Sequence, residues 1–190
     1  MSRLHFRLAR PEDADAIVAL VESAYRGDSS RAGWTTEADL LDGQRTDRED
    51  VLQAMAAPGS RIVLAHPAEE ASARADRSLL DRLLVGTVLV QRDLAGIAHI
   101  GMFAVRPTLQ SRGVGSALLG EAERLAREEL AAARAEMTVI EQRLDILAWY
   151  QRRGYRPTGA TEPFPYGNPR FGLPRRPDLR FLVLAKALSG

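Results

Sequence analysis

Residues 105–116 constrain the fold most strongly, because they join an apolar, strand-like run to a long amphipathic segment through Gly113 and Gly115. Glycine has no β-carbon, so such a turn allows close approach to the backbone and exposes amide N–H groups at the start of a helix. These groups and the helix dipole can bind a diphosphate. The segment fits neither a P-loop nor a dinucleotide-binding turn. The glycines alone leave open a tight turn that binds nothing.

Length and composition limit the classes of protein to consider. With 190 residues, 45% of them hydrophobic, we expect one domain over residues 1–190. The net charge of +1 gives no long-range field, so neither a nucleic acid nor a membrane partner is expected. The absence of cysteine excludes disulfides, thiolate metal sites and a cysteine nucleophile. The first residues resemble neither a signal peptide nor a membrane span, which predicts a cytoplasmic protein.

Hydrophobic periodicity predicts an α/β (α+β) fold class. Apolar residues at helical spacing predict helices near residues 12–25, 37–41, 48–57, 113–132 and 145–153. Period-two alternation and short apolar runs predict strands near residues 5–9, 61–65, 83–91, 97–105, 136–140, 155–158 and 179–186. Residues 67–81 are predicted as a loop, and the proline-rich residues 163–177 as an arch between the last two strands. Gly154 is predicted to end its helix in a left-handed conformation.

Three motifs in the right order resemble those of the GNAT superfamily of N-acetyltransferases. The run Gln110-Ser111-Arg112-Gly113-Val114-Gly115 matches the family's pyrophosphate signature, Gln/Arg-x-x-Gly-x-Gly/Ala. It follows Ala104-Val105-Arg106-Pro107 and precedes a helix ending in Tyr150-Gln151-Arg152-Arg153-Gly154-Tyr155, as in the family. The resemblance implies a central mixed, mostly antiparallel twisted sheet of about seven strands. The sheet would be splayed near its middle and flanked by helices, with acetyl-CoA in the split and no metal.

The resemblance also assigns residues to the binding of acetyl-CoA. The main chain of Phe103, Ala104 and Val105 would pair with the pantetheine amides as a neighbouring strand would. The diphosphate would be bound by Gln110, Ser111, Arg112, Gly113, Val114, Gly115 and Ser116. Arg143 stands seven residues before Tyr150, where the commoner family pattern has an asparagine that contacts the cofactor, and the resemblance places Arg143 among the expected cofactor-binding residues.

Tyr150 resembles the family tyrosine that protonates the departing thiolate, and a phenol is a suitable donor. Without the motif, it would be a core aromatic beside Trp149.

For the general base, His99 lies where histone-acetyltransferase relatives have a glutamate. Strand alternation predicts that it shares a face with Phe103 and Val105. Glu141 is the second candidate for the general base. The alternative for His99 is a buried or surface histidine without a catalytic role.

Residues 33–45 are predicted to cover the acceptor. Trp34 supplies an aromatic ring, Glu37 an acid that could hold an ammonium, and Arg45 a guanidinium that could hold a carboxylate. The alternative is that Thr36 caps a helix and that the acidic side chains of this segment are only solvated, with no role in binding the acceptor. The aromatic residues 164–171 would either wall the cleft or pack for stability.

We therefore expect an acetyl-CoA-dependent N-acetyltransferase that transfers an acetyl group directly to a primary amine of a small molecule. A protein lysine or N-terminal acetyltransferase needs an open groove, which the aromatic covering segments disfavour. A non-catalytic acyl-CoA-binding module would be indicated by loss of Tyr150 or the glycines, and all of these are present. Association as a homodimer through an exposed sheet edge is the expected assembly.

Overall fold

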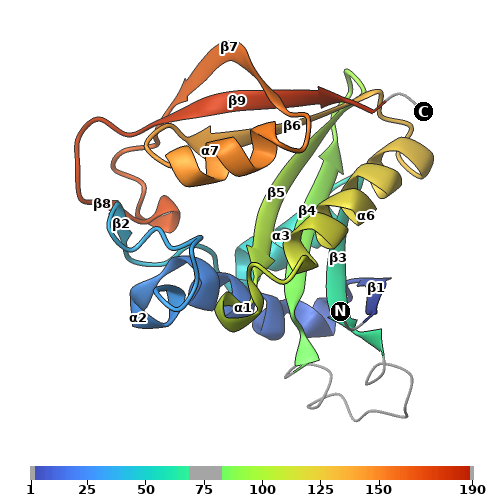
Figure 1. Cartoon of the computed structure of the whole chain (residues 1–190), viewed down its shortest axis with the longest axis horizontal. Coiled ribbons are helices and arrows are strands. Elements are labelled where there is room, and N and C mark those ends of the chain that lie inside the picture. The colour runs from blue at the N-terminus through green and yellow to red at the C-terminus, as the bar shows by residue number, and fades with distance from the viewer. Residues whose placement is uncertain (1–2, 69–82, 189–190) are drawn as a thin grey trace.

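A computed structural model of the chain describes residues 3–68 and 83–188 (Figure 1). Seven strands form one sheet, in the order β1 (Leu4–Leu8), β3 (Ser60–Pro67), β4 (Gly86–Arg92), β5 (Ile97–Val105), β6 (Arg134–Ile140), β9 (Arg180–Ala187) and β7 (Arg156–Pro163). All neighbours are antiparallel except β5 and β6, which are parallel. The predicted mixed, mostly antiparallel sheet flanked by helices is confirmed.

The sheet is splayed where its one parallel pair meets. Strands β5 and β6 pair only at Ile97–His99 against Arg134–Glu136 and then diverge, as Figure 1 shows. Beyond that point β5 carries a β-bulge: Leu89 faces Gly101 and Thr87 faces Ala104, so that Val88 opposes two residues. Met102, within the bulge, has a φ of 45°. A bulge bends its strand and increases the local twist, which directs β5 away from β6.

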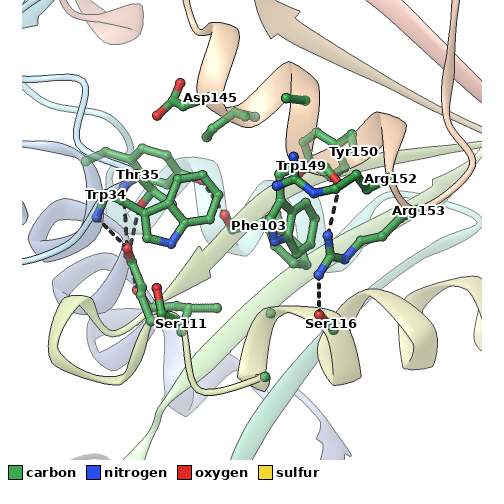
Figure 2. Close-up of a pocket in the computed structure, with 17 residues that line it drawn as sticks. Trp34, Thr35, Phe103, Ser111, Ser116, Asp145, Trp149, Tyr150, Arg152 and Arg153 are labelled. Atoms are coloured by element: carbon green, nitrogen blue, oxygen red, sulfur yellow. Dashed lines mark hydrogen bonds between the residues drawn. The ribbon is translucent and has the colours of Figure 1, made fainter.

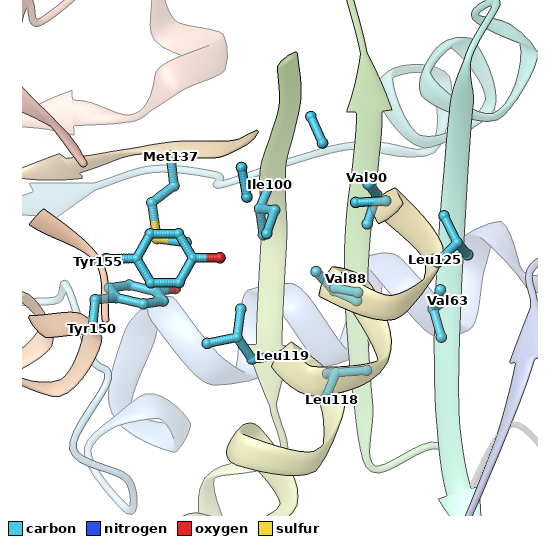
Figure 3. Close-up of a cluster of buried hydrophobic side chains, with 14 of the residues drawn as sticks. Val63, Val88, Val90, Ile100, Leu118, Leu119, Leu125, Met137, Tyr150 and Tyr155 are labelled. Carbon is cyan, nitrogen blue, oxygen red and sulfur yellow. The ribbon is translucent and has the colours of Figure 1, made fainter. Parts of the chain in front are cut away.

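Helices cover both faces of the sheet because alternate strand residues point to opposite sides. On one face lie α1 (Ala14–Tyr25) and α3 (Arg48–Ala56), whose buried residues pack with Ile62 and Leu64 of β3. On the other lie α6 (Val114–Glu128) and α7 (Leu144–Gln151). Figure 3 shows Leu118, Leu119 and Leu125 of α6 against Val63, Val88 and Val90. Burying each of these side chains contributes about 1.5–3 kcal/mol, so this face anchors the start of α6.

Most predicted elements are present, and one is wrong. Residues 37–41 were expected to be helical, but they form a turn into β2 (Leu41–Asp42), which pairs with β8 (Leu173–Pro174) far along the chain. Short helices not predicted from periodicity are η1 (Pro11–Asp13), α2 (Gly27–Ser30), η2 (Pro107–Leu109) and η3 (Pro169–Phe171). Gly154 has the predicted left-handed conformation, with a φ of 93°. Most of the loop predicted over residues 67–81 lies outside the described residues.

No helix in residues 3–68 and 83–188 combines the length and the apolar character needed to cross a membrane.

Candidate active site

A cavity of about 620 Å³ opens between the end of β5, the start of α6 and one side of α7 (Figure 2). We call it the glycine-turn pocket. Its volume is in the range of small-molecule sites. It is lined by Tyr25, Trp34, Thr35, Phe103, Val105, Gln110, Ser111, Gly113, Gly115, Ser116, Asp145, Ile146, Ala148, Trp149, Tyr150, Arg152 and Arg153.

The turn before α6 is built to expose amide groups. Gly113, with a φ of 83°, is the N-terminal cap of α6, and the N–H of Ala117 makes the first helical hydrogen bond, to the Gly113 carbonyl at 3.0 Å. The N–H groups of Val114, Gly115 and Ser116 therefore have no acceptor within the helix. The first turn contains no acidic residue that would repel an anion. This turn fits a diphosphate.

Most residues predicted to bind the diphosphate line the glycine-turn pocket. They are Gln110, Ser111, Gly113, Gly115 and Ser116. The side chain of Arg112 is exposed and that of Val114 packs against the core, so neither side chain lines the pocket. A contact from Val114 would have to come from its backbone.

Arg153, which sequence reasoning did not select, supplies a positive charge at this pocket. Its guanidinium lies 3.6 Å from the centroid of the Trp149 ring, and donates to the Ser116 hydroxyl at 2.5 Å and to the Trp149 carbonyl at 2.9 Å (Figure 2). Burial, followed by the nearby charge of Arg152, lowers the pKa of Arg153. The stacked geometry ties α7 to the start of α6.

Tyr150 lies where the glycine-turn pocket meets a second cavity. Its side chain is 7% exposed and packs edge-on against Trp149, with ring centroids 4.9 Å apart. Its hydroxyl makes no hydrogen bond to any described residue and, unlike that of Tyr155, is not fully enclosed, so it is accessible from these cavities. Burial raises the pKa of Tyr150 well above its usual value, so the phenol stays protonated at neutral pH. A buried, protonated phenol is a proton donor available to a reacting group.

The second cavity has a volume of about 390 Å³, and we call it the arginine pocket. It lies between the segment from α1 to residue 45 and the strands β6, β7 and β9. Its charged lining residues are Arg26, Glu37, Arg45, Arg143 and Glu162. Phe164, Phe171 and Phe181 supply an aromatic wall.

Glu37 and Arg45, predicted from sequence to bind the acceptor, lie together in the arginine pocket. The Glu37 carboxylate is 2.5 Å from Arg26 Nη1 and 3.8 Å from Arg45 Nε. Sequence reasoning missed Arg26 and Glu162. Arg26 ends a helix and Glu162 is on a strand exposed along its length, and no local pattern connects them.

Trp34 lies in a different place from the one predicted. It lines the glycine-turn pocket, with its ring centroid 6.3 Å from that of Trp149, and it is not among the residues of the arginine pocket. The cause is the side chain of Gln110, which accepts from the Trp34 N–H at 2.8 Å and donates to the Thr35 hydroxyl at 2.7 Å. Gln110 thus uses its side chain to hold this loop over the turn.

The expectation for Arg143 is also corrected. Its guanidinium donates to the Thr35 carbonyl at 3.0 Å and the Trp34 carbonyl at 3.3 Å, and pairs with Asp145 at 3.0 Å. It lines the arginine pocket and not the glycine-turn pocket. Four of its five N–H donors are used in this way, so Arg143 positions the loop, and this arrangement does not support a contact between its side chain and a cofactor in the glycine-turn pocket.

The strand end predicted to pair with the pantetheine is partly engaged by side chains. The Phe103 carbonyl accepts from the Tyr25 hydroxyl, and the Val105 carbonyl accepts from Gln110 Nε2 at 3.0 Å. A carbonyl oxygen has two lone pairs, so each retains capacity for a second donor. Ala104 is buried in the core on the α1 face. Pairing of this strand with a cofactor stays a prediction.

His99 lies on the opposite face of the sheet from Val105, so the predicted shared face is wrong. Ala98 and Ile100, the two neighbours of His99 in the strand, pack with Val105 in the core on the α6 side. They share this side with Val105 because the bulge at Met102 reverses the alternation of side chains between Ile100 and Val105. The imidazole is 50% exposed, with Nε2 2.8 Å from an Asp93 carboxylate oxygen. It lines neither the glycine-turn pocket nor the arginine pocket.

Glu141 is engaged elsewhere. Its carboxylate accepts from Arg180 Nε at 2.5 Å and from Arg180 Nη2 at 2.7 Å, and it lines neither pocket. The hydrogen bonds and charge of Arg180 hold the pKa of Glu141 below its usual value. A lower pKa makes a weaker base, and the position is outside the site.

Comparison with known proteins identifies a family for this arrangement. The model of the acetyltransferase (GNAT) family matches residues 34–155, more than half of the chain. No curated protein matches the sequence.

Solved structures share the fold over almost the whole chain. A candidate phosphinothricin N-acetyltransferase is 18% identical, with coverage of 99% of this chain and 100% of that chain and a TM-score of 0.67. Nourseothricin acetyltransferase is 20% identical, with coverage of 98% and 99% and a TM-score of 0.63. A chimera of the spermidine N-acetyltransferase SpeG from Vibrio cholerae and hSSAT is 13% identical, with coverage of 98% and 96% and a TM-score of 0.64. At such identities the likeness establishes the fold.

Proposed function

The chain belongs to the acetyltransferase (GNAT) family, and from this premise we propose that it transfers the acetyl group of acetyl-CoA to a primary amine of a small molecule. The observation that carries the proposal is the position of Tyr150, at the junction of the glycine-turn pocket and the arginine pocket. One pocket has the free helix amides that suit a diphosphate, and the other has charged groups that suit a polar acceptor. The reacting atoms would meet between them.

Acetyl-CoA supplies the acetyl group as a thioester, and the amine nitrogen forms the new C–N bond while the C–S bond breaks. The free amides of Val114, Gly115 and Ser116 would hold the diphosphate at the start of α6. Arg153, beside Ser116, adds positive charge there. The Tyr150 hydroxyl would donate its proton to the departing sulfur.

The amine must also lose a proton, and we propose that neither His99 nor Glu141 takes it directly. Neither side chain lines the two pockets. The proton would leave through the arginine pocket, where the Glu162 carboxylate is exposed to solvent and makes no hydrogen bond or ion pair with the described residues. Water beside Glu162 would carry the proton to bulk solvent.

The dimensions of the arginine pocket favour a small acceptor over a peptide. Its volume of about 390 Å³ is bounded by the aromatic wall, and Phe164 within that wall is 4% exposed. An extended peptide needs a groove open at both ends. The structurally similar proteins with phosphinothricin, nourseothricin and spermidine in their names are consistent with small acceptors.

The test compares classes of acceptor directly. Protein and acetyl-CoA are incubated with pooled small amines, with pooled lysine-containing peptides, or with no acceptor. Released CoA is measured, and acetylated products are identified by mass spectrometry. We expect acceptor-dependent CoA release and N-acetylated product with the small amines. Acetylation of the peptides alone, or CoA release without any acetylated product, would contradict the proposal.

A further inference from the structure

The wall of the arginine pocket that carries Arg26 and Arg45 holds more positive charge than the acid paired with it neutralises. Arg143 is compensated by Asp145 and by two carbonyl oxygens. The guanidinium groups of Arg26 and Arg45 then share one acid, because the same Glu37 oxygen, Oε2, lies 2.5 Å from Arg26 and 3.8 Å from Arg45. One carboxylate carries one negative charge, so this wall keeps about one positive charge without a counter-ion.

Arg26 makes this excess charge energetically significant. The residue is 6% exposed, and its Nε and Nη2 atoms are buried without a hydrogen-bond partner. A buried cation that is incompletely paired is costly, and a nearby anion lowers that cost. Such a group beside a cavity therefore increases the pocket's affinity for a negatively charged ligand.

Arg45 is the part of the wall that a ligand can reach. Its side chain is 38% exposed, and its guanidinium makes no hydrogen bond within the described chain. Its position is nevertheless fixed: the backbone N–H groups of Arg45 and Thr46 donate to a Glu22 carboxylate oxygen at 2.6 and 2.9 Å, and the guanidinium lies 5.6 Å from the centroid of the Tyr25 ring. A fixed guanidinium with free donors suits bidentate binding of a carboxylate.

A negative charge lies on a different wall of the same pocket. Glu162, on β7, lines the arginine pocket and has no ion pair with any described residue, whereas Arg45 comes from the segment after α1. The pocket therefore presents a cation from one side and an anion from another. A ligand that carries one charge of each sign would satisfy both walls.

Building on the proposed function, we propose that the acceptor is a zwitterion of the amino-acid type. Its carboxylate binds the Arg45 guanidinium in the field of Arg26, and its amino group faces Glu162 and the Tyr150 hydroxyl. A polyamine or a simple alkylamine would leave the positive charge of the Arg26 and Arg45 wall without a partner, and so would bind more weakly.

The first experiment uses matched acceptors. The protein and saturating acetyl-CoA are incubated with pooled proteinogenic amino acids, with the corresponding carboxamides, or with the corresponding decarboxylated amines. Acetylated products are quantified by mass spectrometry. The amino acid acetylated fastest is then compared with its own amide and amine. Its kcat/KM should exceed theirs by about 10- to 100-fold, the range expected for a charge-assisted hydrogen-bonding pair.

The second experiment identifies the residue responsible. Arg45→Gln should raise the KM for the amino acid by about 10- to 100-fold and leave the KM of the amide nearly unchanged. Glu162→Gln should weaken binding of both, because both carry the amine. Arg31→Gln is the matched control: Arg31 is an exposed arginine of the same covering region that lies outside the arginine pocket, and its replacement should change neither KM.

The outcomes separate the two proposals. Equal or faster acetylation of the amides or decarboxylated amines overturns the amino-acid assignment and leaves the acetyltransferase proposal intact. Equal effects of Arg45→Gln on the acid and on the amide also overturn it. Absence of acetylated product from every pool of amines, despite bound acetyl-CoA, contradicts the proposed function itself.

Discussion

At the scale of the residue, Tyr150 combines a buried ring with a hydroxyl that is available to a ligand. It is buried, yet its hydroxyl has no hydrogen-bond partner among the described residues. Tyr25, by contrast, is partly buried nearby, and its hydroxyl donates to the Phe103 carbonyl. The Tyr150 hydroxyl oxygen is not fully enclosed, because the residue lines both pockets, so a ligand bound there can supply a hydrogen-bond partner. The thioester sulfur is the partner that we propose.

We predict that Tyr150→Phe slows the chemical step by about 10²- to 10⁴-fold, because it removes a proton donor and keeps the ring packing. Folding and acetyl-CoA affinity should be preserved. Single-turnover acetyl transfer and calorimetric titration measure the two effects. Tyr155→Phe is the control, since Tyr155 is fully buried, packs on Tyr150 and lines neither pocket. A Tyr150→Phe variant with the wild-type rate constant would remove Tyr150 from the mechanism.

We predict that His99→Gln leaves the pH–rate profile of acetyl transfer unchanged. The imidazole is half exposed, pairs with Asp93 and is separated from Val105 by the thickness of the sheet. A general base must come within hydrogen-bonding reach of its proton, directly or through one water. Loss of the rising limb of the profile in the variant would show that His99 acts through a longer water chain.

At the scale of the element, the start of α6 and the loop at residues 34–35 act as two sides of one pocket. The turn exposes its amides because Gly113 is left-handed and because Gly115 has no side chain. The loop stays over the turn because two side chains form hydrogen bonds with it: Gln110, which lies just before the turn, and Arg143, at the start of α7. The pocket is therefore formed by hydrogen bonds between elements as well as by the turn itself.

We predict that Gly115→Val weakens acetyl-CoA binding by about 10- to 100-fold, the loss expected for one or two hydrogen bonds to a charged group. A β-carbon at Gly115 would already lie 3.4 Å from Trp149 Cζ2, so the valine methyl groups would occupy the pocket. Gly120→Val is the matched control, in the same helix and with open space around its β-carbon position. Equal calorimetric affinities of the two variants would contradict the diphosphate assignment.

At the scale of the whole molecule, the Tyr25 hydroxyl links α1 to the bulged end of β5, on the face of the sheet that α1 covers. Burial, with Glu37 adding to it, raises the pKa of Tyr25 to about 12. In the unfolded chain the phenol ionises near its usual pKa of about 10. The folded state therefore binds one more proton than the unfolded state between about pH 10 and 12.

We predict that the stability contributed by Tyr25 is fully present below about pH 10 and is lost as the pH rises to about 12. The loss is about 2.7 kcal/mol for a shift of two pKa units. Denaturant unfolding of the wild type and of Tyr25→Phe at pH 8, 10 and 12 measures it. The wild type should be the more stable at pH 8, and its advantage should shrink with increasing pH. A constant difference between the two proteins would refute the assignment.

The sequence by itself determined the order of strands and helices, the glycine turn and the helix that carries Tyr150. These depend on local causes: periodicity of apolar residues, left-handed glycines such as Gly154, and free amides at a helix start. Such features are encoded within a few residues of chain. The resemblance of the three motifs to a family therefore predicted the fold correctly.

Only the tertiary structure decided which charged groups share a pocket. Arg26, Glu37 and Arg45 come from one segment near the start of the chain and Glu162 from β7 near its end, and they line one pocket beside the splay between β5 and β6. The bulge that turned His99 to the other face depends on the pairing of β5 with β4. The positions of Arg143 and Trp34 also could not be predicted from the sequence, because they follow from hydrogen bonds between segments that are remote in sequence. Long-range pairing of this kind leaves no periodic or spacing signal in the sequence.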